Sequence, residues 1–304
     1  MKGAIAILGS GGFVGTWLMR ELRQRGSHAI WPSSPAEAID IRDEVAIAHL
    51  LALKPAVIVN LAAIASPTEA EKHPALADAV NHRAAVRLAE MVGVSGDCRL
   101  IHVGSAVAYG ESFRSFAPVP ETTPLRPQGV YGVGKAQADM AIAALSAVHP
   151  VSLRLRPFWH AGPGQQAQYV VASFAQQVAR IMRGQQEPVI RVGNLDVARD
   201  YLDVRDVVRL YADLATDAEP RWGEVFNVAS GRAVTIRTLL EGLIARAGLQ
   251  IDIEVDPDRL RRNDVACAMG DASLLLSRVA WRPLIGIDAM LDDVLQDWLQ
   301  RIGT

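Results

Sequence analysis

The stretch Ile5-Ala-Ile-Leu-Gly-Ser-Gly-Gly-Phe-Val-Gly15 decides the fold of this chain. Its apolar lead, Lys2 to Leu8, predicts a short buried strand, because there is no room for a helix before the glycines. Three glycines at three-residue spacing then open an amphipathic segment from Thr16 to Arg25, which predicts a helix. A strand, a tight turn and a helix N-terminus present bare backbone N–H groups and the positive end of a helix dipole to an anion. The stretch therefore predicts a dinucleotide site, although a plain tight turn would also explain the glycines.

The composition of the 304-residue chain favours one large α/β domain, or a large and a small one. Half of the residues are hydrophobic, which is enough for a substantial core. The net charge of −2, from 31 basic and 33 acidic residues, argues against a nucleic-acid partner. Cys98 and Cys267 are far apart, as is typical of reduced thiols in a cytoplasmic protein. Charges or prolines interrupt every apolar run, so we expect no signal peptide and no membrane partner.

Segments typical of strands and helices alternate from the glycine turn to residue 156. The expected strands are His28–Trp31, Ala38–Asp43, Ala56–Ala63, Arg99–Gly104 and Val151–Arg156, and the expected helices are Glu44–Leu53, Ala75–Val92 and Tyr131–Val148. This alternation predicts an α/β fold, a Rossmann-type doubly wound parallel sheet with right-handed crossovers. Ligands of such a sheet gather at the carboxyl ends of its strands.

The pattern loosens after residue 160. The later expected helices are Val170–Arg183, Val204–Ala215, Ile236–Ala247 and Ile287–Arg301, and the later expected strands are Val189–Val192, Val225–Val228 and Ile251–Val255. We expect an NAD(P)-binding domain over residues 1–160, to which residues 200–230 partly return. Residues 161–304 are expected to form mainly a smaller α/β substrate-binding lobe.

The end of the second expected strand bears on the choice of cofactor. NAD-preferring sites place a carboxylate there for the ribose 2′-hydroxyl, whereas this chain has Trp31-Pro32-Ser33-Ser34. Without that negative charge a 2′-phosphate is not repelled, so NADPH is favoured and NAD is the alternative. Further on, Asp40 is placed to meet the adenine amino group. Alternatively, an aspartate here only caps the next helix, and Asp43 is placed to do so. The adenine contact and the helix cap are compatible, because they use different aspartates.

Tyr131-Gly-Val-Gly-Lys135 opens an expected helix, and its one-turn spacing puts the phenol and the ammonium on one face. A phenol with a pKa near 10 is a poor acid–base group at neutral pH, and we expect the adjacent ammonium to lower that pKa towards the working range. Ser105 ends a strand, where its hydroxyl is placed to hold a carbonyl oxygen. A Tyr–Lys pair alone is usually a surface pair. Its occurrence with the glycine turn and the strand-end serine predicts catalysis.

In these features the chain resembles the extended short-chain dehydrogenase/reductases of the nucleotide-sugar epimerase, dehydratase and reductase superfamily, over essentially its whole length. The N-terminal third is similar to dTDP-4-dehydrorhamnose reductases, through Asp40-Ile41, Val59–Ala63 and Ala79–Asn81. The part after Arg154 is similar to GDP-6-deoxy-D-mannose reductases, through Arg156–Gly164, Val192–Asp206, Phe226–Gly231 and Asp256–Arg261.

The resemblance implies roles for particular residues. In the implied catalytic triad Tyr131 donates the proton, Ser105 binds the keto oxygen, and Lys135 tunes Tyr131 and binds the nicotinamide ribose. The implied cofactor contacts, besides Tyr131 and Lys135, are Gly9, Gly12, Phe13, Val14, Gly15, Asp40, Ile41, Leu61, Ala62, Ala63, Asn81, Pro157 and His160. The implied substrate contacts, besides Ser105, are Ala106, Trp159, Arg199 and Arg261, and His160 is also within reach of substrate. The two arginines would grip a nucleotide diphosphate, or else form surface salt bridges with acids such as Asp200 or Asp264.

The residues after Ser105 discriminate between reaction types within the superfamily. Ala106-Val107 stands where 4,6-dehydratases carry an acidic pair, and Val107 stands where GDP-fucose synthases carry a cysteine. Standard 4-epimerases have the strand-two acid that is missing here. The resemblance thus implies NADPH-dependent reduction of the C4 ketone of a nucleotide-activated 4-keto-6-deoxysugar, with GDP-4-keto-6-deoxy-D-mannose giving GDP-D-rhamnose. The alternatives are GDP-6-deoxy-D-talose synthesis, a dTDP-4-keto-sugar substrate, a 4-epimerase and a non-catalytic NADP-binding regulator.

The chain departs from the family pattern at two places. Trp159 replaces the usual family asparagine, where it would stack on a base or sugar face, and Val103-Gly104 replaces a serine-rich lead-in. Family members form a dimeric four-helix bundle from the helices expected at Ala75–Val92 and Tyr131–Val148. Their alanine-rich faces favour such a homodimer, or else contact with the sheet. No metal is expected, because the histidines lack ligand spacing.

Overall fold

The fold is built on a six-stranded sheet in which every neighbouring pair of strands is parallel. The computed structural model describes residues 3–27, 30–32, 38–115, 117–217, 221–260 and 265–303. The sheet has the order β2-β1-β3-β4-β5-β9, and these strands span Ile30–Trp31, Ile5–Leu8, Val57–Asn60, Arg99–Val103, Ser152–Pro157 and Val225–Val228. The expected doubly wound α/β fold is confirmed. The glycine turn follows β1 at the point where the strand order reverses, which is where ligands of such sheets bind.

Helices cover both faces of this sheet. On one face the apolar sides of α1 (Phe13–Gln24), α8 (Val204–Thr216) and α10 (Ser273–Arg278) pack into one core. On the other face α2 (Glu44–Ala52), α5 (Ala85–Ser95) and α6 (Gly129–Val148) pack into a second core. Strands β1, β3, β4 and β5 are buried almost throughout, as strands covered on both faces must be.

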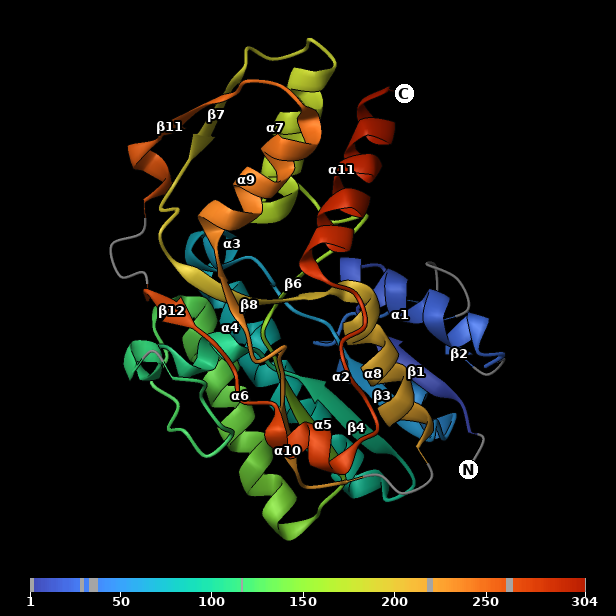
Figure 1. Cartoon of the computed structure of the whole chain (residues 1–304). Helices are drawn as coiled ribbons and strands as arrows, with labels where there is room; N and C mark the ends of the chain where they lie inside the picture. Colours follow the sequence, from blue (N-terminus) through green and yellow to red (C-terminus); the bar gives the residue numbers. More distant parts are fainter. Residues whose placement is uncertain are drawn as a thin grey trace.

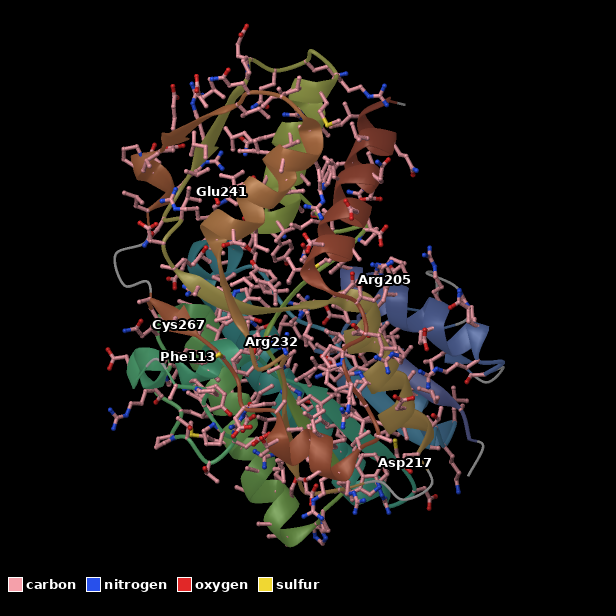
Figure 2. The ribbon with its side chains drawn as sticks, viewed as in Figure 1. Phe113, Arg205, Asp217, Arg232, Glu241 and Cys267 are labelled. Atoms are coloured by element: carbon pink, nitrogen blue, oxygen red, sulfur yellow. The ribbon has the colours of Figure 1, made fainter. Side chains whose placement is uncertain are left out.

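The later part of the chain forms a separate group of helices with its own core. Helices α7 (Val170–Met182), α9 (Ile236–Ala247) and α11 (Ile287–Gly303) gather at one end of the molecule, beside the two-stranded sheet of β7 (Val189–Val192) and β11 (Asp252–Val255) (Figure 1). A small sheet of β10 (Ala233–Thr235), β8 (Ala198–Asp203) and β12 (Cys267–Ala268), which β6 (Trp159–Ala161) joins, lies between this group and the main sheet. Arg205 of α8 ties the two regions together, since it binds Asp203 and, on α11, Asp293 at 2.7 Å each (Figure 2).

Some expected elements differ from the structure. Residues 38–43 do not form the expected strand, because Arg42 binds the Asp40 carboxylate through its backbone N–H at 2.9 Å and through its guanidinium, which closes a turn. The helix expected at Ala75–Val92 consists of α4 (Pro74–Asp78), a π-helical turn η2 (Ala79–Ala84) and α5. The short strands β6, β8, β10 and β12 and the helices α3 (Pro67–Lys72) and α10 were not expected. Among the described helices, none has the length and apolar character to cross a bilayer.

Candidate active site

The glycine turn has the geometry that an anionic cofactor requires. Gly9 adopts a φ of +81°, and a Cβ on it would lie 2.8 Å from the backbone nitrogen of Ala62 at the end of β3. A Cβ on Gly15 would lie 2.3 Å from the carbonyl oxygen of Gly9, so only glycine lets α1 approach the turn this closely. Helix α1 begins after Gly12 with no side-chain cap and no acidic residue in its first turn. Its first backbone N–H groups therefore suit the pyrophosphate of a dinucleotide.

The loop after β5 lies against the same end of α1. The Phe13 ring stacks on His160 with 6.4 Å between centroids and 7° between planes. The indole nitrogen of Trp17 donates to the carbonyl oxygen of Pro163 at 2.8 Å. Pro157 ends β5 and Val14 packs against the core beneath α1. The structure thus brings the residues expected at the two ends of the cofactor, the glycine turn and His160, to one edge of the sheet.

Ser105, Tyr131 and Lys135 lie together at the carboxyl end of β4. Ser105 begins the 3-10 turn η3 (Ala106–Tyr109), and its Oγ accepts a hydrogen bond from the backbone N–H of Val107 at 3.2 Å. The Ser105 hydroxyl lies close enough to the phenol of Tyr131, in the first turns of α6, to lower the pKa of that phenol. Lys135 is only 4% exposed, and its Nζ donates to the carbonyl oxygen of Val103 at 3.1 Å. The three residues expected from their order in the sequence therefore form one group.

The pKa of Tyr131 moves in the direction opposite to our expectation. Burial raises the pKa of the phenol to about 12, and the hydrogen bond with Ser105 lowers it only in part. Burial also lowers the pKa of Lys135 to about 8, because the low-dielectric surroundings disfavour its charge. The expectation that the ammonium brings the phenol close to neutral pH is wrong for this structure, since desolvation dominates. At neutral pH Tyr131 holds its proton and Lys135 is largely charged.

The residues expected around the adenine half lie beside the ends of β1 and β3, and several have partners within the chain. Asp40 binds Arg42, whose hydrogen bonds lower the pKa of the carboxyl. Asp43 caps α2 through the N–H groups of Val45 and Ala46 at 3.0 Å each, as expected. Ile41 is buried, and Leu61, Ala62 and Ala63 are half-buried.

Asn81 lies on the π-helical turn η2, an element that is frequent at functional sites. Its side chain accepts from the N–H of Ile64 at 2.8 Å and donates to the carbonyl oxygen of Ile64 at 3.1 Å. A Cβ on Gly134 of α6 would lie 3.5 Å from its Cβ. Asn81 therefore fixes the loop after β3 against the helix that carries Tyr131 and Lys135. A direct contact between Asn81 and a cofactor stays a prediction.

Trp159 and Arg199, both expected to contact substrate, form one unit. The Arg199 guanidinium lies 5.2 Å from the Trp159 ring centroid, and its Nη1 donates to the carbonyl oxygens of Ala198 and Val265 at 2.8 Å each. Arg199 is 6% exposed, so it is no surface cation. Asp200 accepts hydrogen bonds from the N–H groups of Ser230 and Gly231. The Trp159 ring also meets Phe113 and Phe158 at 6.5 and 6.3 Å between centroids, and Phe113 packs in one core cluster with Ala268 of β12.

Arg261 and Asp264 lie outside the described residues, so the expected role of Arg261 stays a prediction. Ala106 is buried in η3. Among the described residues there is no group of three or more acidic, histidine or cysteine side chains that suits a metal ion.

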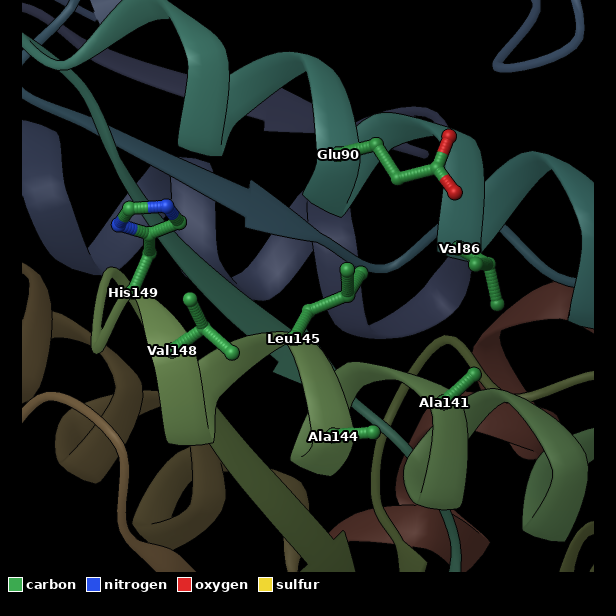
Figure 3. A pocket seen from close by; sticks show the side chains of 7 residues that line it. All are labelled: Val86, Glu90, Ala141, Ala144, Leu145, Val148 and His149. Atoms are coloured by element: carbon green, nitrogen blue, oxygen red, sulfur yellow. The ribbon is translucent and has the colours of Figure 1, made fainter.

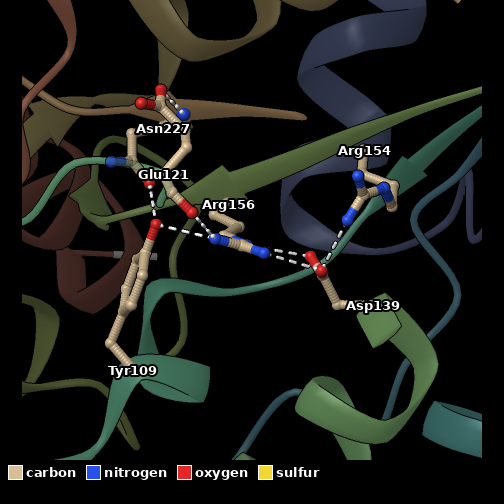
Figure 4. Close-up of polar contacts among 6 residues, drawn as sticks. All are labelled: Tyr109, Glu121, Asp139, Arg154, Arg156 and Asn227. Carbon is tan, nitrogen blue, oxygen red and sulfur yellow. Dashed lines mark hydrogen bonds and ion pairs between the residues drawn. The ribbon is translucent and has the colours of Figure 1, made fainter. Parts of the chain in front are cut away.

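A buried polar cluster that joins η3 to α6 was not expected. It joins Tyr109, Glu121, Asp139, Arg154, Arg156 and Asn227 (Figure 4). The sequence did contain a signal for it, because Arg154 and Arg156 place two charges inside a strand expected to be buried, and Asp139 follows Lys135 by one helical turn. Charges in such places need partners.

The parallel sheet, the glycine turn and the Ser–Tyr–Lys group define an NAD(P)-dependent oxidoreductase of the extended short-chain dehydrogenase/reductase class. Within it the chain belongs to the GDP-mannose 4,6 dehydratase family, whose model matches residues 7–294. A GDP-6-deoxy-D-mannose reductase of Pseudomonas aeruginosa is 31% identical over 307 residues, which cover 99% of each protein.

Two solved structures show the same likeness. The structure of RMD from Pseudomonas aeruginosa complexed with NADPH superimposes with a TM-score of 0.88 at 30% identity, covering 98% of this chain and 99% of that one. A UDP-glucose 4-epimerase of Thermotoga maritima with UDP-glucose has a TM-score of 0.85 at 26% identity, again over 98% and 99% of the two chains.

Proposed function

We propose that this chain reduces the C4 ketone of a nucleotide-activated 4-keto-6-deoxysugar with NADPH, and that it converts GDP-4-keto-6-deoxy-D-mannose to GDP-D-rhamnose. The observation that carries the proposal is the meeting of Ser105, Tyr131 and Lys135 at the carboxyl end of β4, where the Tyr131 phenol keeps its proton at neutral pH. The similarity to a GDP-6-deoxy-D-mannose reductase and to a structure with NADPH supports the choice of substrate and cofactor.

The proposed chemistry divides between the cofactor and the chain. When bound, NADPH supplies the hydride. The N–H groups at the start of α1 hold its pyrophosphate, and Lys135 binds the nicotinamide ribose. The Ser105 hydroxyl binds the keto oxygen of the sugar, and Tyr131 Oη gives its proton to that oxygen as negative charge develops there. The Tyr131 phenol is protonated at neutral pH, as a proton donor must be before the ketone is reduced.

The surroundings of this pair favour simple reduction over dehydration. Ala106 and Val107 follow Ser105, and a Cβ on Gly132 would lie 3.4 Å from Cγ1 of Val107. An apolar side chain therefore lies against the first turns of α6, next to Tyr131, where an elimination would need an acid or a base. Delivery of the hydride to the opposite face of the C4 ketone would give GDP-6-deoxy-D-talose.

The experiment that tests the proposal is product analysis by NMR. GDP-4-keto-6-deoxy-D-mannose is offered with NADPH and, separately, with NADH. We expect GDP-D-rhamnose and a preference for NADPH. Tyr131→Phe should abolish turnover and leave NADPH binding intact. Ketosugar left unchanged by the wild-type protein, at a saturating concentration of NADPH, would contradict the proposal.

The proposal also assigns the two regions of the chain and its assembly. Residues 1–160, with part of residues 200–230, would bind the cofactor, and residues 161–304 would mainly hold the substrate. The two free cysteines favour a cytoplasmic location.

A homodimer through α5 and α6 belongs to the same proposal, and exposed apolar side chains on both helices support it. Met140 is 52% exposed and Val148 is 73% exposed on α6, and Val94 is 90% exposed on α5. A hollow of about 460 Å³ between the two helices is lined by Val86, Glu90, Ala141, Ala144, Leu145, Val148 and His149 (Figure 3). Ala136 and Ala138, in contrast, are buried within the chain, as the alternative of sheet contact requires.

A further inference from the structure

Strand β5 carries two buried arginines that bind one carboxylate. Arg156 is 5% exposed, and its Nε and Nη2 donate to the two oxygens of Asp139 at 2.9 and 2.8 Å. Arg154 donates to the same carboxylate through Nη1 at 2.8 Å. Asp139 is 2% exposed, and the hydrogen bonds from Arg156 keep the pKa of its carboxyl below the usual range despite burial. The bidentate pair therefore fixes Arg156 to α6.

The other end of the same guanidinium reaches a different element. Arg156 Nη1 donates to the phenol oxygen of Tyr109 and to the carbonyl oxygen of Glu121, at 2.9 Å each. The Tyr109 hydroxyl in turn donates to Oδ1 of Asn227 at 2.8 Å (Figure 4). Tyr109 is the last residue of η3 and is fully buried. One side chain thus joins η3 to α6.

These two elements carry the two partners of the proposed catalytic hydrogen bond. Ser105 caps the short turn η3 at its first end, and Tyr109 closes it at the other. Tyr131 and Asp139 lie two turns apart on one face of α6, with Lys135 between them. A hydrogen bond weakens steeply with misalignment, so the Ser105–Tyr131 bond depends on how η3 and α6 are placed relative to each other.

We propose that Arg156 is a positioning residue, and that its bridge between Tyr109 and Asp139 holds Ser105 in hydrogen-bonding register with Tyr131. The proposal rests on the proposed function, because it takes Ser105 and Tyr131 as the groups that bind and protonate the ketone. An arginine suits this place because its planar fork donates in several directions at once, whereas a lysine ammonium would hold only one end well.

The test observes Tyr131 directly and needs no substrate. The five tyrosines are labelled with ¹³C at Cζ, and their NMR signals are assigned with Tyr→Phe variants. Ser105→Ala removes the hydrogen bond and sets the position of an unbonded Tyr131 signal. Tyr109→Phe removes only the hydroxyl that links Arg156 to η3. Arg154→Met is the matched control, because it removes a buried arginine from the same carboxylate and leaves the bridge in place.

We expect Tyr109→Phe to move the Tyr131 signal in the same direction as Ser105→Ala, and Arg154→Met to leave it near the wild-type position. The proposal would be overturned if Ser105→Ala moved the Tyr131 signal and Tyr109→Phe left it in place. If Tyr109→Phe did not fold, Asp139→Asn would test the other end of the bridge by the same signal. No movement in Ser105→Ala would mean that the bond itself is missing, which overturns the proposal as well.

Kinetics provide a second readout that a merely structural role would not give. We expect Tyr109→Phe to lower kcat about tenfold and to leave the KM for NADPH unchanged. Adding Tyr109→Phe to the Ser105→Ala variant should lower kcat no further. The proposal would be overturned if the double variant lost kcat by the product of the two single-variant factors. A wild-type protein that turns over no ketosugar would refute the proposed function alone, because the NMR test would still decide whether Arg156 positions Ser105.

Discussion

Gly11, Gly12 and Gly15, three of the four glycines after β1, allow a graded test of the dinucleotide site, because a methyl group added to each meets a different environment. A Cβ on Gly11 has no neighbour within 4 Å, a Cβ on Gly12 lies 3.3 Å from the Gly9 carbonyl oxygen, and a Cβ on Gly15 lies 2.3 Å from that oxygen. A Cβ on Gly15 would also lie 2.7 Å from Cα of Ser10, so both of its close neighbours are backbone atoms. Gly11→Ala is therefore the matched control for Gly15→Ala.

The size of the effect follows from these distances. To reach an ordinary contact, α1 must move away from the turn by about 1 Å in Gly15→Ala, and overpacking of this kind typically costs about 1–3 kcal/mol. If about 1.4 kcal/mol of that cost falls on the bound geometry, NADPH affinity drops by roughly tenfold. For Gly12→Ala we expect a smaller loss, and Gly11→Ala should bind as the wild type does.

NADPH binding would be measured by fluorescence titration, with thermal unfolding recorded for each variant. A folded Gly15→Ala protein with the NADPH affinity of Gly11→Ala would refute the reasoning, because the close approach of α1 to the turn would then have no part in binding the pyrophosphate. A uniform loss in all three variants would refute it equally, since the structure predicts a graded series.

Three further outcomes are expected. Burial lowers the pKa of His102 to about 3. Below about pH 6.5 the unfolded chain therefore binds a proton at His102 that the folded chain does not bind, so the free energy of unfolding falls as the pH drops. His102→Gln should make the thermal midpoint less dependent on pH between about 6.5 and 4. Trp159→Leu removes the ring that the Arg199 guanidinium lies over and should weaken the binding of GDP about tenfold, with NADPH binding unchanged, as measured by calorimetry. An unchanged GDP affinity would mean that the contact between Trp159 and Arg199 has no role in binding. Met140→Glu places a charge on the exposed apolar face of α6, and sedimentation should show a shift from dimer to monomer; a wild-type monomer would refute the proposed assembly.

The main sheet could be predicted from the sequence because its signals are local. A glycine turn between an apolar strand and an amphipathic helix needs no distant partner to be identified, and the apolar runs of β1 and β3 are typical of strands buried on both faces. The expected bounds of β7, β9 and α9 agree with the structure. The same locality explains why Asp43 was identified as a helix cap.

Elements that depend on distant partners could not be predicted in this way. Strand β8 reads Ala-Arg-Asp-Tyr-Leu-Asp, which has no strand periodicity, and it is held by its neighbours β6, β10 and β12. Its buried Asp200 is tolerated because backbone N–H groups of Ser230, Gly231 and Gly270 bind it. In the opposite case, residues 38–43 have apolar residues at alternating positions, yet the side chain of Asp40 closes a turn with Arg42 instead.

The protonation of Tyr131 shows the same limit of prediction from the sequence. Helical spacing places Lys135 on the face of Tyr131, but spacing contains no information about how much water packing removes from either group. In the structure that loss of water dominates, so the phenol keeps its proton and the ammonium is the group whose pKa approaches neutral pH. A site of this kind is set to give a proton to a ketone. The spacing of the two residues thus predicts that they meet, whereas their protonation depends on how the folded chain packs around them.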